Sequence, residues 1–401
     1  MAVHEGLTEE ETGRVKSLLR QCFPHTNFDK DVSCTFVIQA DNRSFWSKIV
    51  RVHLDWKNVE EGQDHPTSIF MKIPRVSENV RFGEANDYSD LEAAKEAECL
   101  LILTKYEVSF YRNYGNDIIP HFPMPKFYAA EDVTEPGTGI IALEDLSDRV
   151  KTMDLFPGLS LIQLETVMDA LAGFHHHFYT KEDQSWVSSF DRVSEIEKEF
   201  QDVQFGASQM FEKIRPDLFK SKVSALKEYF SLEAATSAHY SYKELGVPPA
   251  PVHFDMNPTN LLWDKEMRKL IAIIDYQLLH TGNFAEDIAR TLTLTMSRQQ
   301  RWNHTNALLK RYHDTLTSLS NGNPPYAISK VYEAYEWIFP YSMNFGLFAM
   351  ANYFDMYNRL EQDEVKRREI QNEITDRAYG AIIDAERYIR LRQNSRRPRR
   401  V

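Results

Sequence analysis

Cysteine is scarce in this 401-residue sequence, and its pattern excludes the simplest cysteine-based architectures. Cys22, Cys34 and Cys99 are an odd number with no C-x-x-C spacing, so neither a disulfide framework nor a cysteine zinc site is expected. The first residues also lack the basic and apolar regions of a secretory signal. We therefore expect a mature protein of the reducing cytoplasm.

Long apolar runs and an excess of positive charge are also missing. The longest apolar runs, such as Ile140–Leu143 and Leu270–Ile274, have the length of strands and fall far short of the ~20 residues of a membrane helix. The 47 Lys and Arg residues against 59 Asp and Glu give a net charge of −12, whereas nucleic-acid binding needs concentrated positive charge. No membrane span and no nucleic-acid partner are therefore predicted.

The length and composition are those of a globular protein with more than one lobe. Hydrophobic residues make up 42% and charged residues 26% of the chain, and single cores stop growing near about 250–300 residues. The order of predicted elements favours an α+β, two-lobed fold. It divides into an amino-terminal lobe, residues 1–147, a helical lobe, residues 148–393, and a basic tail, residues 394–401.

The amino-terminal lobe has the signature of a small, mostly antiparallel sheet with helices. Thr8 and Glu11 form a capping box that opens a helix. Residues from Trp46 to Trp56 alternate between apolar and polar, as in a half-buried strand, and Ser68–Ile73 is expected to be its neighbour. A helix over Asp90–Tyr114 follows, and a strand pair closes the lobe near residue 143.

The second lobe is predicted to be almost entirely helical. The expected helices span Leu161–Tyr179, Val193–Phe205, Ser221–Leu245, Phe284–Ser297, Gln299–Leu319, Ala327–Leu360 and Val365–Leu391. The exception is Pro248–Asp275, where a polar loop and two short apolar runs predict a hairpin set among helices.

This exceptional segment carries the strongest chemical pattern in the chain. It contains His253-x-Asp255, Asn260 and, after an apolar run, Asp275. Phosphoryl transfer needs a carboxylate that receives or orients the acceptor hydroxyl, together with oxygen ligands that hold Mg²⁺ against the phosphates. Asp255, Asn260 and Asp275 supply these groups. Any one of them alone is more typical of an Asx-turn or a cap, but the ordered set favours the phosphotransfer interpretation.

The same segment resembles the catalytic and metal-binding loops of protein-kinase-like phosphotransferases. It is similar to the aminoglycoside phosphotransferase and choline kinase group, and most of all to the CHK kinase-like or ecdysteroid-kinase-like family of insects and nematodes. The family pattern runs H-G-D-x-W-x-x-N-x-L, D-x-Q and G-x-x-x-x-D, and this chain matches it at His253, Asp255, Asn260, Asp275, Gln277, Gly282 and Asp287. The resemblance implies a protein-kinase-like fold and a cytoplasmic kinase that uses ATP and Mg²⁺.

Roles for the loop residues follow from this resemblance. It implies that Asp255 is the base or the group that orients the acceptor, and that His253 belongs to the catalytic loop, where it braces the loop. Asn260 and Asp275 are implied as ligands of Mg²⁺.

A lysine and a glutamate upstream extend the resemblance. Lys72 matches the strand lysine that neutralises nucleotide phosphates, and Glu107 matches the helix glutamate that pairs with it. Helical periodicity places Glu107 on an apolar stripe, where a charge needs a partner. Glu96 also lies on that stripe, so periodicity alone leaves both open, and the E-x-x-F-Y phrase of the family favours Glu107.

The nucleotide base is expected at the end of the amino-terminal lobe. Residues Glu144, Asp145 and Leu146 resemble the hinge of the family, whose backbone groups would bind the adenine edge. The alternative is a strand exit with an acidic turn.

The sequence departs from the family pattern at three places. Phe254 stands where the family often has glycine, and Asn257 replaces the tryptophan of the loop. The turn expected to cover the phosphates, residues 40–47, contains no glycine, although close approach of backbone to phosphate commonly uses glycine. No metal ligand, lysine or base is lost.

The predicted activity is transfer of the γ-phosphoryl group of ATP to a small-molecule alcohol acceptor, sterol or ecdysteroid-like or choline-like. The alternative is a catalytically silent nucleotide-binding module that acts through a partner. A protein kinase is disfavoured because no Ala-Pro-Glu motif follows Asp275.

Overall fold

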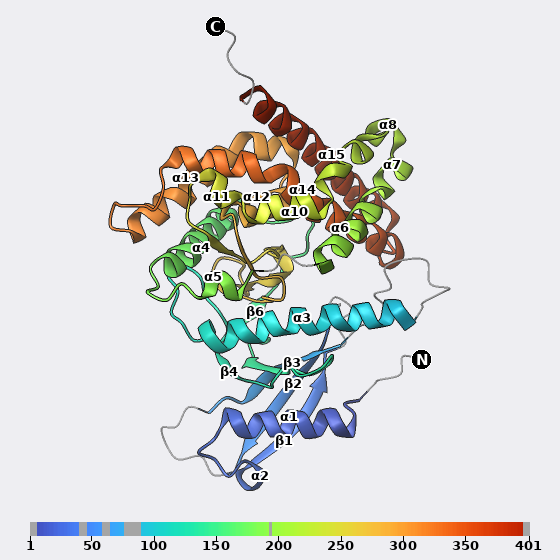
Figure 1. Ribbon diagram of the computed structural model, residues 1–401. Coiled ribbons are helices and arrows are strands. Elements are labelled where there is room, and N and C mark those ends of the chain that lie inside the picture. Colours follow the sequence, from blue (N-terminus) through green and yellow to red (C-terminus); the bar gives the residue numbers. More distant parts are fainter. Residues whose placement is uncertain (1–5, 40–45, 58–64, 76–89, 192–194, 396–401) are drawn as a thin grey trace. The chain divides into compact units, whose positions relative to one another are not determined.

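The computed structural model consists of two compact units (Figure 1). It describes residues 6–39, 46–57, 65–75, 90–191 and 195–395. The sheet unit comprises residues 1–118, 124–150 and 274–278, and the helical unit comprises residues 119–123, 151–273 and 279–401. Most of the turn at residues 40–47 and of the basic tail falls outside the described residues. The domain limits drawn from the sequence stay a prediction.

A five-stranded antiparallel sheet dominates the sheet unit, with strand order β1-β2-β3-β5-β4. The elements of the unit are α1 (Glu9–Cys22), α2 (Phe28–Asp31), β1 (Val32–Ile38), β2 (Ser47–Trp56), β3 (Ser68–Pro74), α3 (Asp90–Tyr114), β4 (Phe127–Ala130) and β5 (Ile141–Glu144). Strand β6 (Val150–Lys151) lies where the chain passes from this unit to the next.

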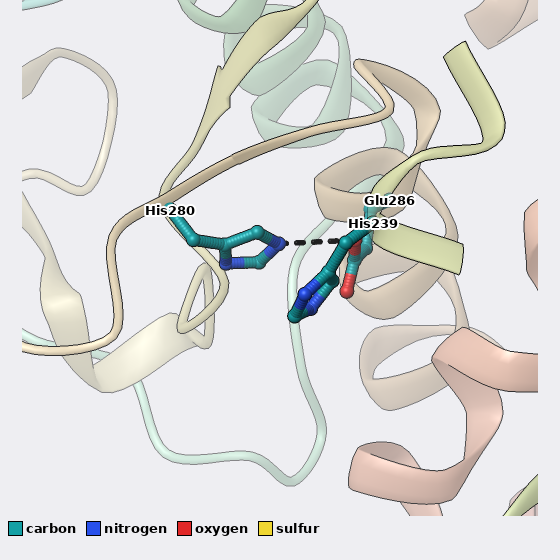
Figure 2. Close-up of side chains that lie close together, drawn as sticks. All are labelled: His239, His280 and Glu286. Atoms are coloured by element: carbon teal, nitrogen blue, oxygen red, sulfur yellow. Dashed lines mark hydrogen bonds and ion pairs between the residues drawn. The ribbon is translucent and has the colours of Figure 1, made fainter. Parts of the chain in front are cut away.

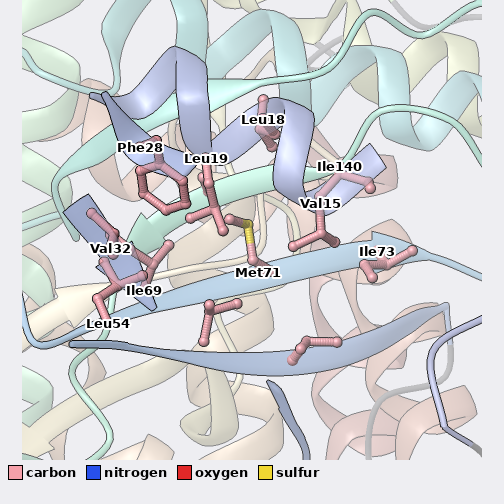
Figure 3. Close-up of a cluster of buried hydrophobic side chains, with 13 residues drawn as sticks. Val15, Leu18, Leu19, Phe28, Val32, Leu54, Ile69, Met71, Ile73 and Ile140 are labelled. Carbon is pink, nitrogen blue, oxygen red and sulfur yellow. The ribbon is translucent and has the colours of Figure 1, made fainter. Parts of the chain in front are cut away.

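Helix α1 covers one face of the sheet and buries its apolar side chains there (Figure 3). The capping box of Thr8 and Glu11 starts the helix as expected. Met71 of β3 is fully buried in the same cluster. Because side chains alternate along a strand, Lys72 lies on the other face of β3.

The helical unit contains the remaining elements (Figure 1). Its helices are α4 (Leu161–Tyr179), α5 (Trp186–Ser189), α6 (Glu195–Ser208), α7 (Met210–Ile214), α8 (Pro216–Phe219), α9 (Lys222–Ala225), η1 (Lys227–Tyr229), α10 (Leu232–His239), α11 (Ser241–Leu245), η2 (Pro258–Asn260), α12 (Ala285–Thr295), α13 (Arg298–Leu319), α14 (Ile328–Leu360) and α15 (Glu364–Ser395). Its strands are β7 (Ala250–Val252), β8 (Leu261–Asp264), β9 (Leu270–Ile273) and β10 (His280–Gly282). Strands β8 and β9 form the expected hairpin, and β7 pairs with β10.

The prediction of one continuous helix over residues 221–245 is wrong. The segment is divided into α9, η1, α10 and α11. Ser221 has a left-handed backbone, with φ of 58°, and Ser231 is extended, with its hydroxyl accepting a hydrogen bond from the Ala234 amide. Such a cap begins a new helix, and the apolar periodicity that runs across it does not reveal the break.

The predicted fold class, α+β with a small antiparallel sheet part and a large helical part, is confirmed. Helix α14 packs against both α12 and α15 and continues through Pro340. Within the described part of the chain, none of the helices combines the length and apolar character of a membrane span.

The cluster beneath α1 predicts a matched pair of substitutions. Met71→Ala removes a fully buried side chain and is expected to lower the free energy of unfolding by about 2–5 kcal/mol, because it leaves a cavity. Val37→Ala, on exposed β1 surface of the same sheet, is expected to change it by less than about 0.5 kcal/mol. Urea unfolding of both variants tests this, and equal effects would contradict the assignment of the core.

Candidate active site

A buried lysine with two carboxylate partners forms the first group of candidate site residues. In the sheet unit, the Lys72 Nζ atom of β3 donates hydrogen bonds to the Glu107 carboxylate of α3 at 2.7 and 2.9 Å. It donates another to Asp275 Oδ1 at 2.9 Å. Only 12% of the Lys72 side chain and 2% of the Glu107 side chain are exposed. The structure therefore selects Glu107 rather than Glu96 as the partner of Lys72.

An aromatic anchor holds Asp275 beside this lysine. Tyr276 is fully buried, and its ring stacks on Phe110 of α3, with centroids 3.9 Å apart, and meets Tyr111 edge-on at 5.3 Å. The Tyr276 backbone amide also donates to Glu107. Asp275 itself has a left-handed backbone, with φ of 72°. The segment of residues 274–278 is thus fixed to α3, with Asp275 next to Lys72.

Burial and charge act in opposite directions on this cluster. Burial lowers the pKa of Lys72, but attraction to Asp275 and Glu107 outweighs it, so the pKa of Lys72 is raised. Burial raises the pKa of Glu107 to about 7, the negative charge of Asp275 acts in the same direction, and Lys72 opposes both. Lys72 therefore stays charged, and Glu107 titrates near neutral pH.

The acidic segment after β5 is anchored through Asp145. Arg51 of β2 forms salt bridges with Asp145 and Asp148, and the Ser147 amide donates to Asp145 at 3.0 Å. Burial raises the pKa of Asp145, but hydrogen bonds from Ser147, Ser68 and Arg51 outweigh it and hold the pKa below its usual range. The Asp145 side chain is therefore a structural anion that is already paired within the sheet unit.

Backbone groups around Asp145 are partly engaged as well. The Glu144 amide donates to the Lys126 carbonyl at 2.8 Å, and the Leu146 carbonyl accepts from the Arg149 amide at 2.8 Å. The Leu146 side chain is buried. These bonds fix the path of the chain at the predicted hinge, where the Glu144 amide and the Leu146 carbonyl are already paired.

The second group of candidate site residues lies in the loop that follows β7, within the helical unit. The Asn257 Nδ2 atom donates to Asp255 Oδ1 at 2.7 Å, and the Asn260 Nδ2 atom donates to Asp255 Oδ2 at 2.8 Å. Each oxygen of the Asp255 carboxylate thus accepts a hydrogen bond from a side-chain amide. Such bonds fix the orientation of the carboxylate.

A buried aspartate of α12 supports this loop from behind. Asp287 accepts the backbone amides of His253 and Phe254, each at 2.7 Å. The buried His253 ring accepts the Asp255 amide at Nδ1, at 3.3 Å. Burial raises the pKa of Asp287 to about 7, although the two amides act in the opposite direction. Both His253 and Asp287 therefore hold the loop that carries Asp255.

The bulky residue in place of the family glycine lies in the core of the helical unit. Phe254 has φ of 73°, a conformation that favours glycine, and it is nearly completely buried. Its ring lies 3.5 Å from the guanidinium carbon of Arg290 and 5.0 Å from the ring centroid of Phe345. Cation–π attraction stabilises this unusual backbone. So do the hydrogen bonds that the His253 and Phe254 amides donate to Asp287, which we call the clamp.

The structure thus groups the predicted site residues into two sets. Lys72, Glu107 and Asp275 come together in the sheet unit, which also holds residues 144–146, and His253, Asp255 and Asn260 come together in the helical unit.

Sequence reasoning missed one residue that positions the loop, Asn257. Asn257 was noted only as a departure from the family pattern, yet its amide holds Asp255 and its side-chain oxygen accepts the Thr259 amide at 2.9 Å. An asparagine before proline is a turn signal that could have indicated this role. The G-x-x-x-x-D pattern indicated a structural role for Asp287, at the start of its helix or behind the loop, and the hydrogen bonds from amides 33 and 34 residues away give it that role.

Comparison with known proteins gives the family. The chain belongs to the family described as “Uncharacterized oxidoreductase dhs-27” (DUF1679), whose profile matches residues 22–391.

Two relatives come from Caenorhabditis elegans. “Uncharacterized kinase-like protein D1044.1” is 29% identical over 361 residues, which cover 88% of this chain and 94% of that protein. “Uncharacterized oxidoreductase dhs-27” is 23% identical over 296 residues, which cover 72% of this chain but only 35% of that longer protein. The resemblance to a kinase-like family of the nematode type, inferred from the sequence, is confirmed.

Among solved structures, similarity extends to a putative aminoglycoside phosphotransferase from Ralstonia eutropha. The two chains are 13% identical, with 94% of this chain and 98% of that chain covered and a TM-score of 0.47.

The raised pKa of Glu107 predicts a pH dependence of stability. A carboxyl group with an ordinary pKa of 4.5 and a folded-state pKa of about 7 binds its proton more tightly in the folded protein. Its contribution to stability is therefore complete below about pH 4.5 and is lost as the pH rises through about 7. Unfolding free energies measured from pH 5 to 8 should fall less steeply for Glu107→Gln than for the wild type, by up to ~1.4 kcal/mol per pH unit. If the unfolding free energies of the two proteins fall equally with pH, the raised pKa of Glu107 is wrong.

The hydrogen bonds from the His253 and Phe254 amides to Asp287 predict a second effect on stability. Asp287→Asn keeps the shape of the side chain but turns an amide group toward one of the two backbone donors at His253 and Phe254. A buried donor left without an acceptor costs about 1–3 kcal/mol, so the free energy of unfolding should fall by that amount. Asp264→Asn, at a turn of the exposed surface, is the control and should change it little. A free energy of unfolding that is the same in Asp287→Asn and in the wild type would contradict the clamp.

Proposed function

We propose that this protein is an ATP- and Mg²⁺-dependent kinase that transfers the γ-phosphoryl group to a hydroxyl of a small-molecule acceptor. The observation that carries the proposal is the ion cluster of Lys72 with Glu107 and Asp275. A buried lysine held by a helix carboxylate, next to a second carboxylate that follows a strand, is the arrangement that kinase chemistry needs for phosphate and metal.

Lys72 would neutralise phosphate charge of the nucleotide. Its ammonium group remains charged in its buried site, because two carboxylates compensate it. Glu107 would hold the ammonium group in place, and the Asp275 carboxylate beside it would serve as a metal ligand. Backbone groups of Glu144, Asp145 and Leu146 would bind the adenine edge.

Oxygen atoms suited to Mg²⁺ are present in both sets of residues. Asn260 uses its amide nitrogen for both of its bonds to Asp255, so its side-chain oxygen is the atom suited to a cation. The Asp275 side chain is 32% exposed and offers a carboxylate. Oxygen donors of this kind fit Mg²⁺, which when bound would supply charge compensation for the phosphates.

Asp255 would receive the proton of the acceptor. The acceptor oxygen forms a bond to the γ-phosphorus, the bond from that phosphorus to the β–γ bridging oxygen breaks, ADP leaves, and the hydroxyl proton passes to the Asp255 carboxylate. The amides of Asn257 and Asn260 hold that carboxylate in one orientation. His253 and Asp287 are positioning residues of the loop.

Aromatic side chains near Asp255 support an organic alcohol as acceptor. Tyr353 of α14 makes a side-chain hydrogen bond with Thr259, and burial, followed by the negative charge of Asp255, raises its pKa. Its ring lies 6.3 Å from that of Tyr357. Such a surface suits a sterol or ecdysteroid-like ring system by apolar contact, or a choline-like cation by cation–π attraction.

The second candidate function is a catalytically silent nucleotide-binding module that acts through a partner. The observation that favours it is the left-handed backbone of Phe254, a strained conformation beside the proposed base in place of a glycine. The two candidates differ in whether the Asp255 carboxylate is needed for turnover.

Release of ADP in the presence of Mg²⁺ tests the kinase directly. The purified protein is assayed with sterol alcohols, ecdysteroids, choline, ethanolamine and aminoglycosides. One acceptor class should give turnover that Asp255→Ala lowers by about 10²–10⁴-fold, the typical contribution of a positioned base. The control Asp169→Ala removes an aspartate of the helical unit that is paired with Arg311, and it should keep the activity.

Three outcomes would contradict the proposed kinase activity or the role of Asp255 in it. ATP binding without turnover that depends on Asp255 would favour the silent module. Turnover equal in the Asp255→Ala and wild-type proteins would remove Asp255 from the mechanism. A protein that binds neither ATP nor Mg²⁺ would overturn both candidate functions.

A further inference from the structure

Two histidines and a glutamate converge inside the helical unit, apart from the residues already assigned (Figure 2). His239 ends α10, His280 begins β10, and Glu286 lies in the first turn of α12. All three are buried, with at most 2% of each residue exposed. One potential ligand atom from each lies within 4.8 Å of the others. Three separate elements thus bring metal-binding side chains to one point in the core.

The spacing of these atoms is close to that of a tetrahedral metal site. His280 Nε2 and Glu286 Oε2 lie 3.3 Å apart. Zinc binds histidine nitrogen and carboxylate oxygen at about 2.0–2.1 Å, which places neighbouring tetrahedral ligands about 3.3–3.4 Å apart. The ring centroids of His239 and His280 are 4.3 Å apart. The distance between His280 Nε2 and Glu286 Oε2 therefore already equals that of two ligands of one ion, and a ligand atom of His239 lies within 4.8 Å of both.

The carboxylate of this group is also held in position. Arg290 Nη2 donates to Glu286 Oε1 at 2.7 Å, so the other oxygen, Oε2, is the one that faces His280. A hydrogen bond that fixes a ligating carboxylate in this way is typical of metal sites. The Arg290 guanidinium in turn lies over the ring of Phe254, which connects the group to the catalytic loop.

We propose that His239, His280 and Glu286 bind one structural divalent transition-metal ion, with Zn²⁺ as the fitting species. Imidazole ligands select zinc over magnesium, so this ion is distinct from the Mg²⁺ of the proposed reaction. Three protein ligands leave one tetrahedral position for a water molecule.

The position of the three ligands gives the ion a role in holding the catalytic loop. His280 is paired in register with Val252, the residue just before the loop, and Glu286 directly precedes Asp287, which clamps the loop amides. An ion at this point links α10, β10 and α12 behind Asp255. The proposal is independent of the proposed kinase activity, because it predicts metal binding and stability whatever the protein phosphorylates.

Metal content and thermal stability of the full-length protein test the site. The protein is stripped with a chelator, dialysed with Zn²⁺ and analysed for bound metal, and its melting temperature is measured with and without Zn²⁺ and Mg²⁺. We expect about one Zn²⁺ per chain and a melting temperature raised by Zn²⁺ but not by Mg²⁺. Cobalt reconstitution should give the visible absorption of a tetrahedral site.

Substitutions then assign the binding to these residues. His239→Gln and His280→Gln should weaken Zn²⁺ binding by more than about 100-fold, since loss of outer-shell partners alone costs about 10–100-fold. His175→Gln is the matched control, because His175 is equally buried in the helical unit but is bonded to Tyr312 at 2.7 Å. It should retain the metal.

Two results would overturn the proposal. A folded wild-type protein that takes up no stoichiometric Zn²⁺ would show that the three residues form a hydrogen-bonded network with Arg290 and no ion. Zinc bound equally by the His239, His280 and His175 variants would place the metal elsewhere. If the cluster variants fail to fold, the wild-type reconstitution decides alone.

Discussion

A lysine removed from water needs opposite charge close by, and the sheet unit is organised around this need at Lys72. An unpaired buried ammonium would cost several kcal/mol or lose its proton. Glu107 of α3 and Asp275 both lie within 2.9 Å of Lys72, and the stacking of Tyr276 on α3 brings Asp275 there. The charge of Lys72 on β3 thus joins that strand to α3 and to the segment of residues 274–278, which is remote in sequence. The same pairing keeps Lys72 protonated, as a phosphate-binding role requires.

Carboxylates have the corresponding part in the helical unit, where they organise backbone instead of a cation. Asp287 accepts hydrogen bonds from two backbone amides of the loop and thereby fixes the backbone that carries Asp255. Asn257 and Asn260 then orient the Asp255 carboxylate itself. Hydrogen bonds thus fix both the backbone of the loop and the carboxylate that it carries. Such an arrangement is preorganised, as the proposed reaction requires.

The sequence predicts those features of fold and site that depend on local pattern or on a family motif. Capping chemistry located the start of α1, alternation located β2, and the apolar stripe of α3 placed Glu107 on a buried face. Features that depend on convergence in space were not predictable. Periodicity did not reveal the break at Ser231, since a hydroxyl cap interrupts a helix without altering its apolar spacing. His239, His280 and Glu286 belong to three elements with no common motif, and only the tertiary structure brings them together. Phe254 was marked as a departure, but its packing against Arg290 required the position of α12.

Equilibrium binding of ATP measured by calorimetry, with and without Mg²⁺, tests the central claim most directly. The variants to compare are Lys72→Met and Lys48→Met, because Lys48 is also a largely buried lysine of the same sheet, paired with Glu11 instead. The account predicts that the wild type and Lys48→Met bind ATP more tightly with Mg²⁺, and that Lys72→Met loses most of this binding. Equal binding by the two variants would contradict the role assigned to the Lys72 cluster.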